Sequence, residues 1–255
     1  MNRDEFRNLA YGTYVTAFKG VVTTSNAGDS PLALRYRSYL RRRLGPWLDG
    51  VPRSASVADL GCGDGMLLRV FQELGFSNLH GVEGSAEMCA LCRRHFPGVE
   101  HGDLREFLRR NAGKFDVIAL FDVLEHFTRE EAVGLLAEIN AALRPSGRLL
   151  LQLPNGDSPF SGGVFAADLT HETLYTAGSL GHMLALGWFD LVAVDEHSAE
   201  PVDLRSAVRW AGWGILRRLI GLCHRMETGG VSSGIYTRVM RALAIKQGPD
   251  ASKSE

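Results

Sequence analysis

Three glycines alternate with other residues directly after an apolar run that ends in an acid. The stretch VADLGCGDG spans residues 57–65 and contains Gly61, Gly63 and Gly65. Glycine at the junction of a strand and a helix permits positive φ and lets a ligand approach the backbone closely. The spacing G-x-G-x-G differs from the dinucleotide pattern G-x-G-x-x-G. The loop therefore predicts a nucleotide-like ligand without identifying it.

Carboxylates surround this loop in the expected arrangement. Asp59 precedes the glycines, Asp64 lies among them, and Glu83 ends the next predicted strand. Ligands of an open parallel sheet bind beyond the carboxyl ends of its strands, so Asp103 and Asp122 belong to the same rim. Five carboxylates would repel the phosphates of a dinucleotide. They suit a ligand with a sulfonium and an ammonium group, and S-adenosylmethionine carries both.

The chain alternates predicted strands and helices, which indicates an α/β fold with a parallel sheet and helices on both faces. A helix over residues 31–48 comes first. Predicted strands cover residues 54–60, 78–83, 98–103, 115–122, 148–155, 188–197 and 234–246. Predicted helices follow the early strands at residues 65–75, 85–96, 104–111 and 129–143, and a further one covers 177–186. Residues 144–147 (RPSG) are predicted to form a turn.

These motifs together resemble the class I S-adenosylmethionine-dependent methyltransferases over residues 30–195. The resemblance rests on VADLGCGDG, LHGVEGS, HGDL, FDVIALFDVLEHF and LRPSGRLLLQLPN, which stand in the family's order and at its distances. It implies a Rossmann-like, seven-stranded, mostly parallel sheet whose last strand is antiparallel. The chain adds a helical insertion before that strand.

The resemblance also implies roles for the loop and the second strand. Asp59 and the backbone of Gly61–Gly65, with Cys62 and Gly63 included, are expected to hold the methionine part of the cofactor. Glu83, with Gly84 beside it, is expected to hold the ribose. An acid at the end of the second strand can accept hydrogen bonds from two ribose hydroxyls. Many family members carry Asp where this chain has Glu83.

Two later motifs receive cofactor roles by the same resemblance. Asp103 and the Leu104 amide are expected to contact the adenine edge. Phe121 and Asp122 are expected to line the cofactor near the reacting methyl group.

The second half of the chain resembles a subgroup found in bacterial polysaccharide and lipopolysaccharide gene clusters. LPNGDSPF, DLTHETLYTAGSLGHML, METGG and IYTRVMRALAIK carry this likeness, which implies O-methylation of a sugar or glycan hydroxyl. There are two alternatives. The methyl acceptor is a quinone-like or other small aromatic molecule, or the protein binds its ligand without turnover. The first alternative is also a methyl transfer, to a different acceptor. The second is a protein that binds the cofactor without catalysis, which intact cofactor motifs do not exclude because they indicate binding and not chemistry.

A sugar hydroxyl has a high pKa, so a base that takes its proton would assist methyl transfer. His171 and Glu172 follow the fifth strand on the substrate side of the sheet, and His126 follows the fourth strand. Histidine suits a general base because its ordinary pKa lies near neutral pH. For each residue the competing interpretation is a structural hydrogen bond that holds a loop. That interpretation is favoured for His126, and for His171 the two are balanced.

Composition limits the partners and the location. Lys and Arg total 28 against 29 Asp and Glu, so no global basic field indicates a nucleic-acid partner. No run of the roughly 18 apolar residues that a spanning helix needs occurs, and the N-terminus has no apolar core typical of a signal peptide. We expect a cytoplasmic protein, with peripheral contact to the inner membrane as a further possibility. Cys89 and Cys92 form a C-x-x-C without a second ligand pair, so no metal site is expected.

The insertion contains an amphipathic helix over residues 203–225. Its main apolar stripe consists of Leu204, Val208, Ala211, Ile215, Leu219 and Leu222. We expect this stripe to pack on the domain, with the helix buried between the sheet and the N-terminal segment. A second apolar band consists of Trp213, Leu216 and Ile220. Together with five arginines, this extra apolar surface suggests a contact with a membrane surface or a homodimer as alternatives.

The expected organisation has five parts. Residues 1–48 form an N-terminal helical cap, residues 49–200 the cofactor-binding core, residues 201–230 the helical insertion, residues 231–247 the last core strand, and residues 248–255 a disordered tail.

Overall fold

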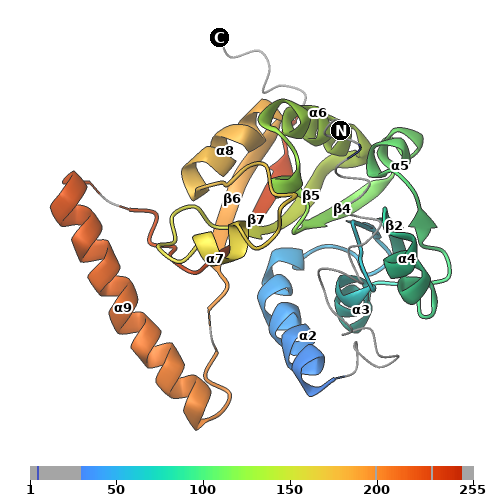
Figure 1. Cartoon of the computed structure of the whole chain (residues 1–255). Coiled ribbons are helices and arrows are strands. Elements are labelled where there is room, and N and C mark those ends of the chain that lie inside the picture. The colour runs from blue at the N-terminus through green and yellow to red at the C-terminus, as the bar shows by residue number, and fades with distance from the viewer. Residues whose placement is uncertain (1–4, 6–29, 199, 231, 249–255) are drawn as a thin grey trace.

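A seven-stranded sheet forms the centre of the protein in the computed structural model, which describes residue 5 and residues 30–198, 200–230 and 232–248. The strands are β1 (Ser56–Leu60), β2 (Asn78–Glu83), β3 (Glu100–His101), β4 (Phe115–Phe121), β5 (Leu143–Pro154), β6 (Phe189–Glu196) and β7 (Val239–Lys246). Their order is β3-β2-β1-β4-β5-β7-β6 (Figure 1). Strand β7 is antiparallel to both of its neighbours, and the remaining pairs are parallel. The predicted fold class is therefore confirmed.

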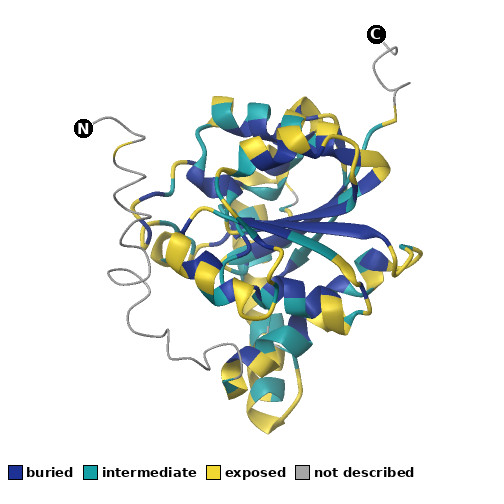
Figure 2. Ribbon diagram, turned by 90° about the vertical axis from the view of Figure 1, so that its right-hand side faces the viewer, coloured by how far each residue is buried: buried dark blue, intermediate teal, exposed yellow. Residues whose placement is uncertain are grey.

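Helices cover both faces of this sheet. The helices of the described residues are α2 (Pro31–Leu44), α3 (Met66–Glu73), α4 (Ala86–Arg93), α5 (Leu104–Arg110), α6 (Arg129–Ala142), α7 (Gly162–Phe165), α8 (Ala177–Leu186) and α9 (Leu204–Thr228), with 3₁₀ turns η3 (Pro46–Leu48) and η4 (Leu124–His126). Helices α5, α6 and α8 share one hydrophobic core with the sheet, and α2 and α3 share a second core on the other face. The strands between the two layers are largely buried (Figure 2). Burial on both faces explains why β1 and β4 read as apolar runs in the sequence.

Local sequence signals set the ends of several helices. The Ser30 side chain accepts a hydrogen bond from the Ala33 amide and begins α2, with a proline at the first helical position. Thr128 and Glu131 form a capping box that begins α6. These caps fix where the helices start relative to the strand ends and therefore fix the loops between them.

The start of β5 differs from the predicted turn and strand. Leu143 already pairs with Phe115, and Arg148 pairs with Val117, so the RPSG segment bulges out between two paired positions. Ser146 adopts a φ of 59° within this bulge. A turn signal in the sequence is compatible with either a connection or a bulge, because both need an irregular backbone.

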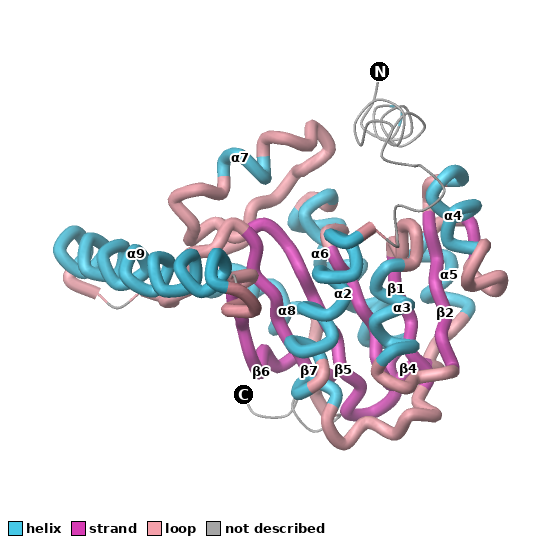
Figure 3. The backbone as a smooth tube through the Cα atoms, turned by 90° about the horizontal axis from the view of Figure 1, so that it is seen from below, coloured by secondary structure: helices cyan, strands magenta, loops and turns pink. Residues whose placement is uncertain are grey.

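The inserted helix α9 does not lie in the core. None of its residues is buried, and the helix extends from the sheet edge rather than across a face of the sheet (Figures 1 and 3). The expectation that this helix is buried between the sheet and the N-terminal segment is wrong. An amphipathic period predicts that one face of a helix differs from the other, but it does not predict which face meets the domain.

Two further expectations concern residues that the structure largely leaves undescribed. The first 29 residues of the predicted cap, apart from residue 5, lie outside the described residues, as do residues 249–255 of the predicted tail. Among the described helices, none combines the length and the apolar character needed to cross a membrane.

Candidate active site

The predicted cofactor residues gather at the carboxyl ends of β1, β2 and β4. The glycine loop follows β1 and leads directly into α3. Gly61 and Cys62 both donate backbone hydrogen bonds to the Val82 carbonyl of β2, at 2.9 Å and 3.1 Å. These bonds fold the loop back over the neighbouring strand and place it at the rim where ligands of such sheets bind.

Glycine is required at the ends of this loop. Gly61, Gly63 and Gly65 have φ values of 74°, 55° and 85°, which lie in the left-handed region. A Cβ on Gly61 would lie 2.7 Å from the Val123 side chain, and a Cβ on Gly65 would lie 2.8 Å from the sulfur of Cys92. The spacing of the glycines therefore reflects both backbone conformation and close packing against the next elements.

Glu83 ties the glycine loop to the turn after β2. One carboxylate oxygen accepts a hydrogen bond from the Gly63 amide at 2.8 Å, and the other accepts one from the Ser85 amide at 2.7 Å. The carboxylate is therefore oriented by two backbone donors. Each oxygen can accept a further hydrogen bond, so ribose hydroxyls and this loop contact are compatible.

Asp59 lies beneath the loop with only 2% of its surface exposed. Burial, followed by the negative charges of Glu83 and Asp64, raises the pKa of Asp59 to about 8. The Asp59 carboxyl is therefore not fully ionised at neutral pH beside the other two carboxylates. A cation bound there would relieve this repulsion, as the sequence argument anticipates.

Asp103 and Asp122, for which adenine and methyl-group contacts are predicted, follow the next two strand ends. Asp103 caps α5, because one of its oxygens accepts hydrogen bonds from the Arg105 and Glu106 amides at 2.8 Å and 2.9 Å. Leu104 is the first residue of that helix and is partly buried. The carboxylate therefore has a fixed position at the rim, beside the first amide of the helix.

Asp122 directly follows Phe121, the last residue of β4, and has a φ of 54° although it is not glycine. Its carboxylate accepts a hydrogen bond from the Gln152 side chain of β5 at 2.9 Å. Tyr36 of α2 in turn donates to the Gln152 oxygen at 3.3 Å. Strained backbone is found preferentially at functional sites. Gln152 lies within the LRPSGRLLLQLPN motif but has no role predicted from it, and Tyr36 stands in no motif, so neither residue is among those predicted for the site.

Cys62 and Gly84 occupy different environments. The Cys62 sulfur is buried and lies 3.9 Å from the sulfur of Cys92, and this contact together with burial raises the pKa of the Cys62 thiol. Gly84 is exposed, and a Cβ there would meet no heavy atom within 4 Å. The Cys62 side chain thus belongs to the core, which leaves its backbone for any ligand contact.

His126 lies in η4 immediately after β4, and its side chain is mostly buried. Its Nδ1 lies 2.8 Å from the Thr170 hydroxyl oxygen, and that hydroxyl donates to the Asp168 carboxylate at 2.6 Å. Because the hydroxyl proton points to Asp168, Nδ1 of His126 must be the donor to Thr170. Burial, followed by the charge of His171, lowers the pKa of His126 to about 4. His126 thus joins η4 to the loop after β5, as the structural interpretation describes.

His171 lies in the same loop and contacts His126, with ring centroids 4.7 Å apart. Its Nδ1 lies 2.8 Å from the carbonyl oxygen of Phe165, an acceptor, so Nδ1 carries the proton in the neutral ring. Nε2 is then unprotonated and lies 3.9 Å from a carboxyl oxygen of Glu125. The ring is therefore held by its carbonyl bond in the tautomer that a proton acceptor needs.

Glu125 completes this group, and the sequence analysis did not select it. Only 1% of Glu125 is exposed, and among the described residues its Oε2 has no hydrogen-bond partner. Burial, followed by the charge of Asp122, raises the pKa of Glu125 well above its ordinary value. An acid inside the apolar run VLEHF was the available signal, because a carboxylate is rarely buried without a role.

Glu172 follows His171 and contacts this group through its backbone. The residue is exposed, and its backbone amide donates to the Glu125 carbonyl at 2.8 Å. The structure therefore brings two of the three proposed proton acceptors together and places the third on the surface beside them.

Glu125, His126 and His171 each offer a potential metal-ligating atom within 4.8 Å of the others. The four cysteines are free, and three of them are buried. The C-x-x-C therefore packs as part of the core. The histidine cluster is the place in the described part of the chain where three such donors converge.

Comparison with known proteins agrees with this geometry. A family model described as a methyltransferase domain matches residues 34–212. An Archaeoglobus fulgidus S-adenosylmethionine-dependent methyltransferase of known structure superposes with a TM-score of 0.60 at 20% identity, covering 82% of this chain and 94% of that one. This likeness supports the fold.

Curated relatives differ in the molecules their names specify. A Streptomyces fradiae dTDP-3-amino-3,6-dideoxy-alpha-D-glucopyranose N,N-dimethyltransferase is 37% identical over 36% of this chain and 34% of that enzyme. A Xenopus tropicalis tRNA (carboxymethyluridine(34)-5-O)-methyltransferase is 32% identical over 43% of this chain and 17% of that protein. An Aromatoleum aromaticum ubiquinone biosynthesis O-methyltransferase is 26% identical over 78% of this chain and 83% of that enzyme. The first two likenesses span well under half of those relatives.

The family match covers most of the chain, from α2 into α9, and includes the glycine loop, its surrounding acids and the η4 turn. The chain therefore belongs to the methyltransferase domain family.

Proposed function

We propose that this enzyme methylates a hydroxyl oxygen of a sugar or glycan and that His171 accepts the hydroxyl proton. The observation that carries the proposal is the fixed tautomer of His171. Its Nδ1 donates to the Phe165 carbonyl, which leaves Nε2 free of a proton. The ring belongs to the loop after β5, beside the turn that follows Asp122. A base placed there meets the requirement that a weakly acidic hydroxyl loses its proton during transfer.

The residues around the glycine loop fit S-adenosylmethionine. When bound, this cofactor supplies an activated methyl group on a sulfonium. Asp59 and the backbone of the loop hold the charged methionine part, and Glu83 accepts hydrogen bonds from the ribose. Asp103 and the Leu104 amide hold the adenine edge, with Gly84 leaving open space beside Glu83. The electrostatic support is the raised pKa of Asp59, because a cation would stabilise the ionised carboxylate.

Transfer is an in-line displacement in which the carbon–sulfur bond breaks and a carbon–oxygen bond forms. The protein aligns the acceptor and receives the proton. Phe121 and Asp122 line the approach from β4, and the Gln152 side chain fixes the Asp122 carboxylate. His171 Nε2 receives the hydroxyl proton. Burial, followed by the charge of Asp122, raises the pKa of Glu125 well above its ordinary value, so the surroundings of the imidazoles oppose a negative charge on this carboxyl.

The acceptor class rests on two lines of support. The likeness to the polysaccharide-cluster subgroup covers the second half of the chain, and the Streptomyces fradiae relative is named for an amino-sugar nucleotide. A glycan carried on a lipid would be methylated at the cytoplasmic face of the inner membrane. Nucleic acid is not expected as an acceptor, because the chain has a net charge of −1.

A quinone-like or other small aromatic acceptor is the second candidate. It is favoured by the Aromatoleum aromaticum relative, whose likeness extends over 83% of that enzyme. A phenolic hydroxyl is far more acidic than a sugar hydroxyl, with an ordinary pKa near 10 for tyrosine. Loss of His171 should therefore slow transfer to a phenol much less than transfer to a sugar. A non-catalytic binding protein would show neither reaction.

Mass spectrometry of the native glycan tests the proposal. Glycan from cells with the protein should carry a methyl group that glycan from cells without it lacks. Incubating the unmethylated glycan with purified protein and S-adenosylmethionine should restore the group. Methylation of a catechol panel or of tRNA, with no change in the glycan, would contradict the proposed acceptor. Absence of any transfer while the cofactor binds would support the non-catalytic alternative.

A further inference from the structure

The apolar stripe of α9 faces solvent along the whole helix. Residues of this stripe recur at steps of four and three, which places them on one side of the helix. The large members are between half and four-fifths exposed: Leu204 82%, Val208 65%, Ile215 61%, Leu219 52%, Leu222 50% and Met226 79%. A continuous row of this kind is uncommon on a protein that has no partner, because exposed apolar area is usually scattered.

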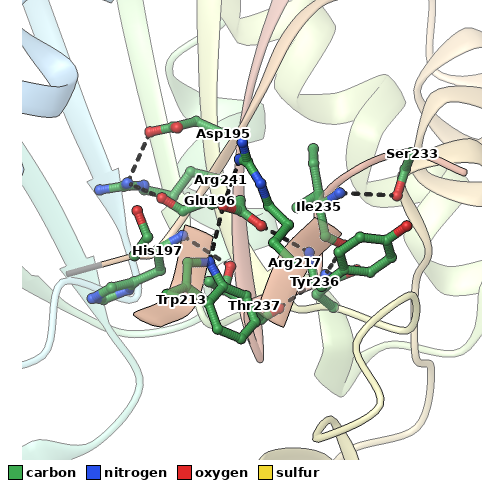
Figure 4. A network of polar contacts seen from close by, with 12 residues as sticks. Asp195, Glu196, His197, Trp213, Arg217, Ser233, Ile235, Tyr236, Thr237 and Arg241 are labelled. Atoms are coloured by element: carbon green, nitrogen blue, oxygen red, sulfur yellow. Dashed lines mark hydrogen bonds and ion pairs between the residues drawn. The ribbon is translucent and has the colours of Figure 1, made fainter. Parts of the chain in front are cut away.

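The opposite side of α9 holds the helix to the sheet edge. Trp213 Nε1 donates to the Glu196 carboxylate at 3.3 Å, and Arg217 donates to the same oxygen at 3.2 Å (Figure 4). The other Glu196 oxygen accepts from the Tyr236 amide at 2.9 Å. Glu196 thus joins β6, α9 and the segment before β7. Trp213, from the band that the sequence suggested as surplus surface, is therefore on the side of α9 that meets the domain, whereas Leu216 of that band is 40% exposed.

The anchor itself is rigid because Arg241 of β7 is fully buried beneath it. One Arg241 nitrogen contacts the Tyr39 hydroxyl at 2.7 Å, the Asp195 carboxylate at 2.9 Å and the Glu196 carbonyl at 3.0 Å. These bonds connect α9's attachment point to the sheet and to α2. The direction in which α9 presents its stripe is therefore fixed by the fold.

Arginines border the exposed stripe on both sides. At 100° per residue, Arg205 lies beside one edge of the stripe, and Arg218 and Arg225 lie beside the other. Helix α9 contains five arginines and one acid, Glu227. An apolar face with basic borders is the pattern of helices that lie in the surface of an anionic membrane.

The same charges oppose pairing with a second copy. In either orientation, a second copy would bring its own Arg205, Arg218 and Arg225 to the borders of the shared apolar face. Like charges on facing helices are destabilising, and α9 has no complementary row of acids.

We propose that α9 is a membrane-docking arm that binds an anionic lipid surface through its exposed stripe and bordering arginines. The arm enters the outer part of the bilayer, and no part of it needs to cross. It leaves the sheet after Glu196, the last residue of β6, and β6 runs parallel to β1 and β4. The carboxyl ends of β1, β4 and β6 therefore lie at the same edge of the sheet. Because the arm extends from the edge that carries the candidate active site, docking brings that edge toward the membrane.

Vesicle flotation with the full chain tests the arm. Wild-type protein should bind phosphatidylglycerol–phosphatidylcholine vesicles, bind pure phosphatidylcholine much more weakly, and lose binding as salt is raised. Ile215→Ser with Leu219→Ser should reduce binding at least about tenfold, since it removes the centre of the apolar stripe. Leu186→Ser is the matched control, because Leu186 on α8 is 52% exposed, as Leu219 is. The control should bind as wild type does.

A second pair of variants separates charge from apolar contact. Arg205→Gln with Arg218→Gln should remove the preference for anionic vesicles, whereas Arg109→Gln with Arg110→Gln, on exposed positions of α5, should keep it. All variants should keep the wild-type melting temperature and its increase with S-adenosylmethionine. Absence of vesicle binding by wild type would overturn the proposal. So would a wild-type dimer by light scattering that the Ile215 and Leu219 changes convert to a monomer.

Discussion

The imidazole rings of His126 and His171 lie 4.7 Å apart, although 44 residues separate them in the chain. Their hydrogen bonds differ in a way that separates their roles. His126 bonds to Thr170 and so joins two loops, whereas His171 bonds to a carbonyl oxygen and keeps Nε2 free of a proton. The pair therefore combines one ring that holds the loop with one ring that can receive a proton.

His171→Ala should lower the methyl-transfer rate by roughly a hundredfold or more, the usual effect of losing a positioned base. The affinity for S-adenosylmethionine should stay near the wild-type value, because His171 is outside the glycine loop. Single-turnover kinetics and calorimetry measure the two quantities. Glu172→Gln is the control, and its exposed side chain predicts a rate close to wild type. A His171→Ala enzyme with the wild-type rate would place the base at His126 or Glu172.

Glu83→Ala and Asp59→Ala should each weaken S-adenosylmethionine binding strongly. The first removes the proposed ribose acceptor and the bonds to Gly63 and Ser85, and the second removes the carboxylate proposed to face the cation. In wild type the cofactor should raise the melting temperature by mass action, and NAD should leave it unchanged. Thermal shift and calorimetric titration give both results. Wild-type affinity in both variants would refute the assignment of these residues.

The Asp59 contribution to the stability of the free protein should fall as pH rises from about 4 to about 8. Asp59 has an ordinary pKa of 3.8 in the unfolded chain and about 8 in the folded one, so folding opposes its ionisation across this range. The penalty is absent below the unfolded pKa and complete above the folded pKa. Glu125 acts in the same direction. Urea unfolding at several pH values should show the decline, and Asp59→Asn should make it shallower. Equal slopes for the two proteins would show that Asp59 ionises freely.

Dialysis against a chelator should leave methyl transfer unchanged. Nδ1 of each histidine is occupied by a hydrogen bond, and burial raises the pKa of Glu125 well above its ordinary value, which opposes the ionised carboxylate that a metal ligand supplies. The sequence likewise predicts no metal. Assays with and without EDTA, followed by addition of Mg²⁺, Mn²⁺ or Zn²⁺, measure the effect. Activity that falls with EDTA and returns with one metal would instead make Glu125, His126 and His171 its ligands.

The sequence alone determined the fold class and the position of the cofactor loop. Alternating strands and helices require parallel strands, and the carboxyl ends of parallel strands meet at one edge. Asp59, Glu83 and Asp122 each stand at or next to a strand end, so their gathering at one rim follows from local pattern and a general rule. The family motifs add to this inference because they occur within single short segments.

The proton-accepting group depended on tertiary structure. Glu125 lies in an apolar run and Thr170 in a loop, and nothing local indicates that they meet. Their contacts form because the loop after β5 folds back onto η4, where Glu172 and Thr173 donate backbone bonds to the Glu125 carbonyl. The tautomers of the two histidines follow from those partners and have no signal in sequence.

Helix α9 shows most clearly which properties follow from sequence and which follow from tertiary structure. The sequence determined that it is a basic amphipathic helix with two apolar bands, because periodicity is a property of the chain itself. Which band meets the domain was decided only by Glu196, whose carboxylate binds Trp213 and Arg217 and turns the main stripe outward. A helical period defines faces relative to one another, and only a contact from another element can orient them.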